Sequence, residues 1–160
     1  MKRLLASRSI KILGLVAVAL FAVAAFQSCA SAKITAPGVS GGDLADCPSS
    51  PNCVSSSASD PDHHIEPFSP SAGQSVDDLA LAIAAAVREL PRSTVIEDSK
   101  DYMSAEFRSR MFRFVDDLEI HVDREEGLIH VRSAARTGYS DMGVNRKRIE
   151  SIRARIASTD

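Results

Sequence analysis

The sequence predicts an α+β domain: a four-stranded antiparallel meander, with one helix before it and one helix after it, both packed on one face of the sheet. Two observations carry this prediction. Apolar residues recur at three- and four-residue steps in two segments, and they alternate with polar residues in the segments between. A Pro-rich segment precedes the first helix and is expected to wrap around the domain, with a short edge strand at 52–56. The sheet face away from the helices is expected to stay polar.

The first helix is expected from Ser75 to about Leu90. Ser75 or Asp77 can cap its first turn, and Pro91 stops it. One face of this helix is apolar, so it is expected to pack against the sheet. The residues on that face are Val76, Leu79, Ala80, Ile83, Val87 and Leu90.

Four strands are expected next, at 93–97, 102–108, 112–122 and 128–135. Their apolar positions change from odd to even numbers between the second and third strands. Because side chains alternate with a period of two, a turn or bulge is expected at 109–111. The large core residues are expected to be Phe68, Phe107, Phe112 and Phe114.

The last helix is expected from about Val144 to Ala157, after a turn at Gly138. Ile149, Ile152 and Ile156 lie on one side of it, and basic residues occupy the rest. We therefore expect a single domain over residues 47–157.

An export signal is expected at residues 1–32, because basic residues precede an apolar run at 12–26 and small residues follow. The run reaches about 22 Å as a helix, which is short of the roughly 30 Å hydrocarbon layer of a bilayer. Cleavage after Ala32 fits the small-residue rule. Ser28 and Cys29 resemble a bacterial lipobox, which would leave a lipid on Cys29, although Phe26 and Gln27 are atypical there.

A flexible tether is expected at residues 33–46, which are rich in Gly, Ala and Ser without apolar periodicity. Beyond residue 32 the chain has 15 basic and 21 acidic side chains. This negative balance argues against nucleic acid as a partner.

A disulfide between Cys47 and Cys53 is expected, since an exported chain matures in an oxidising compartment. The alternative is a metal site of these two thiols with His63 and His64. The five-residue gap between the cysteines is wider than in common zinc knuckles, so no metal is expected. A redox Cys-x-x-Cys motif is absent from the sequence.

The polar sheet face carries the candidate ligand site. Arg108, Arg132 and Arg136 are expected on neighbouring strands, where guanidinium groups could bind an anion; the alternative is a solvated face of salt bridges. The loop before the last helix adds Tyr139, Asp141 and Asn145, which are either turn and cap residues or part of an anion site at a helix N-terminus.

Asp116 is the one acidic residue on the apolar face of its strand, so it is expected to pair with an arginine or a backbone N–H group. An alternative function is a hydrolase that uses Asp116, Asp117 and His130. The sequence contains no nucleophile elbow, phosphate-binding Gly-rich loop or His-Glu-x-x-His motif, so no catalytic residue or cofactor is expected.

Several motifs in order resemble the bacterial and plant family known as domain of unknown function 1499. They are Cys-Pro-Ser-Ser-Pro-Asn-Cys from Cys47, Ala-Glu-Phe-Arg-Ser-Arg from Ala105, Phe-Val-Asp-Asp from Phe114, and the stretch from Arg132 to Arg146. The resemblance covers about residues 46–157 and implies an envelope or organelle-targeted protein, with no established reaction, cofactor or ligand.

The functional expectation is therefore an exported envelope protein on the periplasmic side, with a lipid anchor at Cys29 as one option. Its domain is expected to be a non-catalytic module that binds a small anion or a protein partner. A hydrolase and a purely structural envelope protein are the alternatives.

Overall fold

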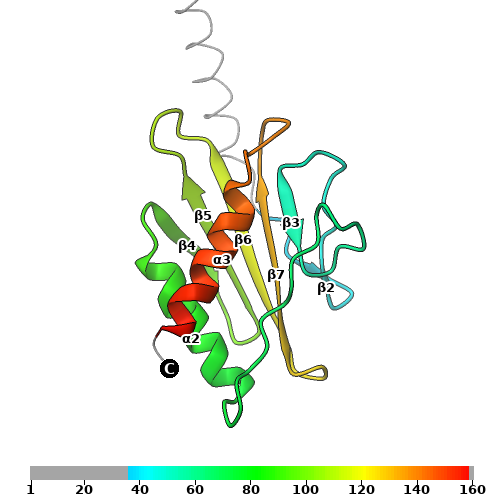
Figure 1. The fold of residues 1–160 in the computed structure, drawn as a ribbon, viewed down its shortest axis with the longest axis vertical. Helices are drawn as coiled ribbons and strands as arrows, with labels where there is room; N and C mark the ends of the chain where they lie inside the picture. The colour runs from blue at the N-terminus through cyan, green and yellow to red at the C-terminus, as the bar shows by residue number, and fades with distance from the viewer. Residues whose placement is uncertain (1–35, 159–160) are drawn as a thin grey trace, which may run out of the picture.

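A computed structural model describes residues 36–158 of the chain. Its main feature is a five-stranded antiparallel sheet in the order β3-β7-β6-β5-β4, with two helices against one face (Figure 1). The elements are β1 (Val39–Ser40), β2 (Asp43–Leu44), β3 (Cys53–Ser55), α2 (Val76–Glu89), β4 (Ser93–Asp98), β5 (Tyr102–Arg108), β6 (Val115–Asp123), β7 (Leu128–Ala135) and α3 (Val144–Ala157).

The expected α+β meander is confirmed in β4 to β7, each strand pairing with the next along the chain. The expected number of strands in the sheet is wrong, because the short edge strand expected at 52–56 joins the same sheet as a fifth strand. β3 comes from the Pro-rich segment and pairs with β7, with Cys53 opposite Ala134 and Ser55 opposite Arg132. The pairing itself is not visible in the sequence, because it joins residues about 80 positions apart.

Both helices match their expected positions. Ser75 caps α2 in a capping box: its hydroxyl accepts the N–H of Asp78, whose carboxylate accepts the N–H of Ser75. The chain leaves the helix at Leu90, directly before Pro91. The helices cover one face of the sheet and bury its apolar residues. The core includes Ile83, Val87, Leu118, Ile120, Ile129, Val131, Ile149 and Ile152.

The connection between β5 and β6 differs from the expected short turn at 109–111. β6 begins at Val115, and residues 109–114 form a loop whose ends are joined by two hydrogen bonds. Ser109 N–H donates to the Phe114 carbonyl at 2.8 Å, and Phe114 N–H donates to Ser109 Oγ at 2.9 Å. Phe112, expected in the core, is exposed in this loop.

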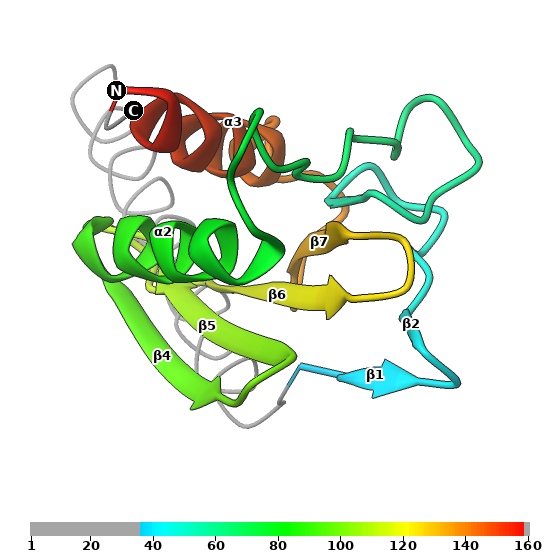
Figure 2. The ribbon, with the colours of Figure 1, turned by 90° about the horizontal axis from the view of Figure 1, so that it is seen from below.

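The sheet face away from the helices is not open, contrary to expectation. Residues 39–44, expected in a tether, form the β1–β2 hairpin on that side, and β2 contacts β6 and β7 (Figure 2). Leu44 is buried there.

β4 is the strand at one edge of the sheet. Its pairing with β5 shifts register between Val95 and Glu97, and Ile96 is exposed at that point. No helix within residues 36–158 is long and apolar enough to cross a membrane. The expected export signal at 1–32, with its candidate lipidation site Cys29, lies outside the described residues.

Candidate functional site

The polar face of the sheet contains a buried network of ion pairs. Glu119 is fully buried and accepts three hydrogen bonds at its carboxylate. Oε1 accepts the Tyr102 hydroxyl at 3.0 Å and the Gly38 N–H at 2.8 Å, while Oε2 accepts Arg132 Nη1 at 2.8 Å. Burial and the nearby Glu119 carboxylate raise the pKa of Tyr102. These contacts satisfy a carboxylate that would otherwise be costly to bury.

Arg136 lies between two carboxylates on the same face. Its Nε and Nη2 donate to the two oxygens of Asp117, at 2.8 and 2.7 Å, and Nη2 also donates to Glu106 Oε1 at 2.7 Å. The hydrogen bonds to Asp117 raise the pKa of Arg136. The other oxygen of Glu106 accepts Arg108 Nη2 at 2.7 Å.

The expected anion site on this face is therefore not formed as proposed from the sequence. Alternation does place Arg108, Arg132 and Arg136 on one face, but each guanidinium already pairs with a carboxylate of the sheet. The side chains of Arg132 and Arg136 are 9% and 2% exposed, whereas that of Arg108 is 33% exposed. Only Arg108 of these three reaches solvent to a useful extent.

The loop before α3 holds the helix start in place. Asp141 Oδ1 accepts the N–H of Gly143 at 3.0 Å, and Oδ2 accepts the N–H of Asn145 at 2.7 Å. Asn145 is fully buried; its Nδ2 donates to the Asn52 carbonyl at 3.0 Å. Tyr139 is exposed to solvent. Asp141 and Asn145 thus have structural partners.

Asp116 pairs with an arginine, as expected. Arg148 Nη2 donates to Asp116 Oδ2 at 2.6 Å, and the guanidinium carbon of Arg148 lies 4.4 Å from the ring centroid of Phe107. Burial raises the pKa of Asp116, and Arg148 opposes that shift.

The residues of the hydrolase alternative do not lie together. Asp116 faces the helices, whereas Asp117 is on the opposite face of the sheet and bonds to Arg136. His130 pairs with His121, four residues along β6 from Asp117, which corresponds to about 13 Å of strand. One substrate atom could not reach all three groups.

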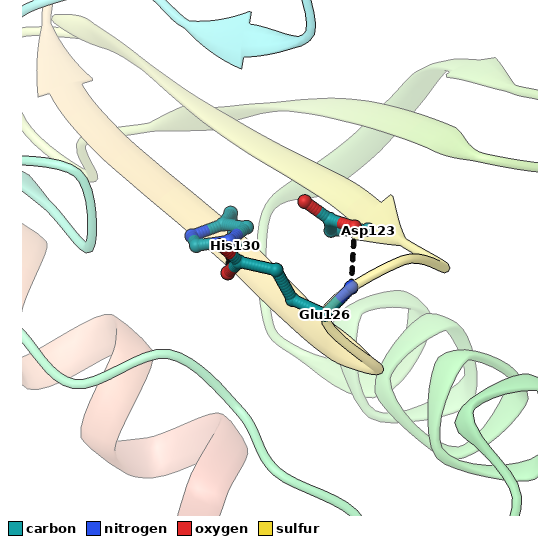
Figure 3. A group of neighbouring side chains, drawn as sticks. All are labelled: Asp123, Glu126 and His130. Atoms are coloured by element: carbon teal, nitrogen blue, oxygen red, sulfur yellow. Dashed lines mark hydrogen bonds and ion pairs between the residues drawn. The ribbon is translucent and has the colours of Figure 1, made fainter.

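A second cluster lies where β6 turns into β7. Oxygen atoms of Asp123 and Glu126 and a ring nitrogen of His130 lie within 4.8 Å of one another (Figure 3). Asp123 Oδ1 accepts the N–H groups of Glu125 and Glu126 at 2.8 and 2.9 Å, which lowers the pKa of Asp123, the bond from Glu126 contributing most. These contacts hold the hairpin turn, so the cluster has a structural explanation without a metal.

Cys47 and Cys53 form a disulfide with an S–S distance of 2.05 Å. The alternative metal site with His63 and His64 is therefore wrong. His63 Nδ1 lies 2.7 Å from Asp60 Oδ2, and its Nε2 lies 3.1 Å from the Ser50 carbonyl oxygen.

The open cationic site of the domain lies at the end of the sheet where β4 begins and β5 ends. A hollow of about 280 Å³ is bordered there by four arginines and three hydroxyl-bearing residues, and no described acidic residue lines it. We call it the arginine hollow. Its lining residues are Arg92, Ser93, Thr94, Arg108, Ser109, Arg110 and Arg113.

Backbone contacts hold two of these arginines in position. Arg92 Nε donates to the Arg108 carbonyl at 3.1 Å, and Arg108 N–H donates to the Arg92 carbonyl at 3.3 Å. No ion pair within residues 36–158 involves Arg92, Arg110 or Arg113.

The backbone of the arginine hollow is unusual in one respect. Arg92 has φ of 62° and Arg113 has φ of 55°, in the left-handed region where glycine is favoured; Met142 is the other non-glycine residue of this kind in the described chain. Such conformations cost a residue with a Cβ roughly 1 kcal/mol or more. Two strained residues therefore supply two of the four guanidinium groups.

A neighbouring hollow of about 250 Å³ shares Arg92, Arg108 and Ser109 with the first. It adds Lys147 and Arg148 from α3, and its one acidic residue is Asp116, already paired with Arg148. The two hollows form one basic region on a domain whose overall charge is negative.

The sequence-based reasoning missed Arg92, Arg110 and Arg113. A usable signal was present, because Arg108, Arg110 and Arg113 occur within six residues at a strand-to-strand connection. Assigning 112–122 to one continuous strand placed Arg113 on a sheet face and concealed this cluster.

The match to a family model agrees with the pattern of motifs in the sequence. Residues 43–156 match the family model described as protein of unknown function (DUF1499). The chain belongs to this family. A search of curated proteins finds no match.

Proposed function

We propose that the protein is exported to the cell envelope and that its domain is a non-catalytic module that binds an anionic group in the arginine hollow. The observation that carries this proposal is the composition of the site: four arginines and three hydroxyl-bearing residues border one hollow, without an acidic residue in its lining. Ion pairs neutralise Arg132 and Arg136 of the sheet face, and Arg108 pairs with Glu106. The open positive charge of the hollow therefore comes mainly from Arg92, Arg110 and Arg113.

The expected export supports an envelope location. The basic start, the apolar run at 12–26 and the small residues up to Ala32 are typical of a signal segment. A Cys47–Cys53 disulfide is compatible with an oxidising compartment such as the periplasm. Release after Ala32 gives a protein without an anchor, and lipidation of Cys29 gives an anchored one.

The chemistry of the hollow favours phosphate-like or carboxylate anions. A guanidinium group presents two parallel N–H donors that match two oxygens of such an anion. Arg110 and Arg113 come from a loop whose ends are bonded together, and Thr94 and Ser109 add hydroxyl donors. Hydrogen bonds to charged groups are each worth about 1.5–3 kcal/mol, so losing one arginine should weaken binding about ten-fold or more.

The test is a titration of the exported protein with inorganic phosphate, sulfate and citrate, followed by NMR of the arginine Nε–H groups. The signals of Arg92, Arg108, Arg110 and Arg113 are expected to shift together and to saturate. Replacing Arg110 by Ser and Arg113 by Gly should remove the response.

Arg155→Ser is the matched control, because Arg155 lies in the last turn of α3 and pairs with Glu89. This variant should bind like the wild type. The hollow is not a binding site if the anions shift the Arg155 signal of the wild type as much as the signals of the arginine hollow. The same conclusion holds if the shifts do not saturate.

A further inference from the structure

We infer that the anion bound by the arginine hollow is the headgroup of an anionic phospholipid, and that this end of the domain docks on a bilayer surface. The inference rests on the proposed function and names its ligand. It adds one observation that the anion site alone does not use: apolar side chains are exposed around the same end of the molecule.

Five of the eight large hydrophobic residues that are exposed within residues 36–158 lie in the β5–β6 and β7–α3 connections or at the first residue of α3. Both connections lie at the upper end of the molecule in Figure 1. The exposed residues are Met111, Phe112, Tyr139, Met142 and Val144. Exposed apolar groups gathered in this way mark interaction surfaces.

The apolar and basic groups are interleaved. Met111 is 77% exposed and lies between Arg110 and Arg113 in the β5–β6 loop, together with Phe112. Val144, at the start of α3, lines the hollow next to the arginine hollow. An anionic bilayer offers phosphate groups to the arginines and, a few ångströms deeper, apolar space for the methionine and phenylalanine side chains. A free anion would use only the arginines.

The β5–β6 loop is shaped for this contact. The bonds between Ser109 and Phe114 close its base, so four consecutive residues, 110–113, project as a compact tip. All four are exposed. A tip of two arginines around a methionine and a phenylalanine can enter the headgroup layer without unfolding the sheet behind it.

The length of the preceding chain allows this orientation when Cys29 carries a lipid. Seven peptide links separate Cys29 from Ala36 and reach at most about 24 Å. Gly38 is fixed at Glu119, which lies four residues, about 13 Å, from the start of β6 at Val115. The reach of the chain between Cys29 and Ala36 exceeds the distance from Glu119 to Val115, where the β5–β6 loop ends. A lipid on Cys29 therefore does not hold this end of the sheet away from the membrane.

The chain has no tryptophan, so one introduced tryptophan reports on one site. Phe112→Trp places the reporter in the loop, and Leu81→Trp places it on the exposed side of α2 as the matched control. Each exported protein is mixed with vesicles of phosphatidylcholine alone or of phosphatidylcholine with phosphatidylglycerol. If Cys29 carries a lipid, both tryptophan variants carry it, so the lipid cannot cause a difference between the two reporters or between the two vesicle types.

The expected result is a blue shift of the tryptophan fluorescence of the Phe112→Trp protein on vesicles with phosphatidylglycerol and none on phosphatidylcholine, with the Leu81→Trp protein unchanged on both. Adding Arg110→Ser and Arg113→Gly should weaken the partitioning about 25-fold, because each basic residue near an anionic surface contributes about five-fold. Added salt should weaken it as well.

The absence of a shift at Phe112→Trp, or an equal shift on both vesicle types or at both reporters, would overturn the membrane inference. The phosphate titration then separates the two proposals. Saturable phosphate binding without vesicle binding leaves the anion site standing and rejects the membrane, and the absence of both rejects both.

Discussion

Gly38 donates its backbone N–H to Oε1 of Glu119 at 2.8 Å, although the two residues are 81 positions apart. This bond fixes the segment before β1 against the middle of β6. The face of the sheet that the sequence presents as polar surface is therefore an interior, and its charges act as structural groups.

Glu119→Gln should destabilise the domain by about 3 kcal/mol. The neutral amide would leave the buried Arg132 without its anion, and removing one partner of a buried pair is costly. Urea unfolding measures the loss. Glu125→Gln, on the exposed hairpin turn, is the control and should change stability by less than about 0.5 kcal/mol. Equal stabilities for the two variants would contradict a buried network.

Arg113→Gly should weaken anion binding while leaving the melting temperature unchanged or raising it. Glycine adopts the left-handed φ of 55° without strain, and nothing among the described residues bonds to this guanidinium. Calorimetry and the phosphate titration check the two effects. Arg113→Lys tests the charge alone: it keeps the strain and should retain part of the binding. A loss of stability in Arg113→Gly would show that the arginine serves the fold.

Stability should fall as pH rises through the pKa of His63. Both ring nitrogens face acceptors, Asp60 Oδ2 and the Ser50 carbonyl, so only the doubly protonated ring satisfies both. The hydrogen bond to Asp60 accordingly raises the pKa of His63 above 6.5. Because the pKa is higher in the folded state than in the unfolded state, protonated His63 stabilises the fold. This stabilisation is complete at pH values below the unfolded-state pKa and is lost as the pH rises through the folded-state pKa.

The pH effect is measured as melting temperature from mildly acidic to mildly alkaline buffer. His63→Gln should flatten the curve in that range, whereas His64→Gln, at the next residue, should keep the wild-type slope. A wild-type curve that rises with pH in the same range would contradict the assignment.

Reduction of the Cys47–Cys53 disulfide should lower stability by about 2–2.5 kcal/mol, the value expected from chain entropy for so short a loop. The comparison is unfolding with and without reductant. A double Cys47→Ser, Cys53→Ser variant should match the reduced protein and should not respond to reductant. Resistance of both thiols to alkylation before reduction verifies the starting state.

Maturation is decided by mass spectrometry of the exported protein. Lipidation of Cys29 predicts a diacylglyceryl mass on the N-terminal residue and release from membranes on Cys29→Ser. An unmodified N-terminus at Lys33 would show cleavage after Ala32 and would exclude the anchor.

The sequence predicts those elements whose pattern is local. The bounds of β5, β7 and α3 agree with the expected ranges, because strict alternation and helical spacing depend on a few neighbouring residues. The predicted pairing of Asp116 is also confirmed. A single carboxylate on an apolar strand face needs a partner, and Arg148 is that partner.

The failures share a physical cause. Alternation of apolar and polar residues shows that a sheet has two faces, but it does not show what covers the polar face. The buried residues Glu119 and Arg136 therefore have the same sequence pattern as solvent-exposed residues. The pairing of β3 with β7 and the position of the β1–β2 hairpin depend on contacts between distant parts of the chain. The arginine hollow is likewise built from the start of β4 and a loop after β5, which only the folded sheet brings together.

The register shift at Ile96 affects how copies of this protein meet. An edge strand with a regular row of free N–H and C=O groups can add the edge of another molecule and begin a growing aggregate. In β4 the irregularity interrupts that row, and Glu97 follows it with a negative charge. A second copy approaching this edge would meet a broken ladder and like charges. This edge of the sheet therefore resists the addition of a second copy and the growth of a fibre from it.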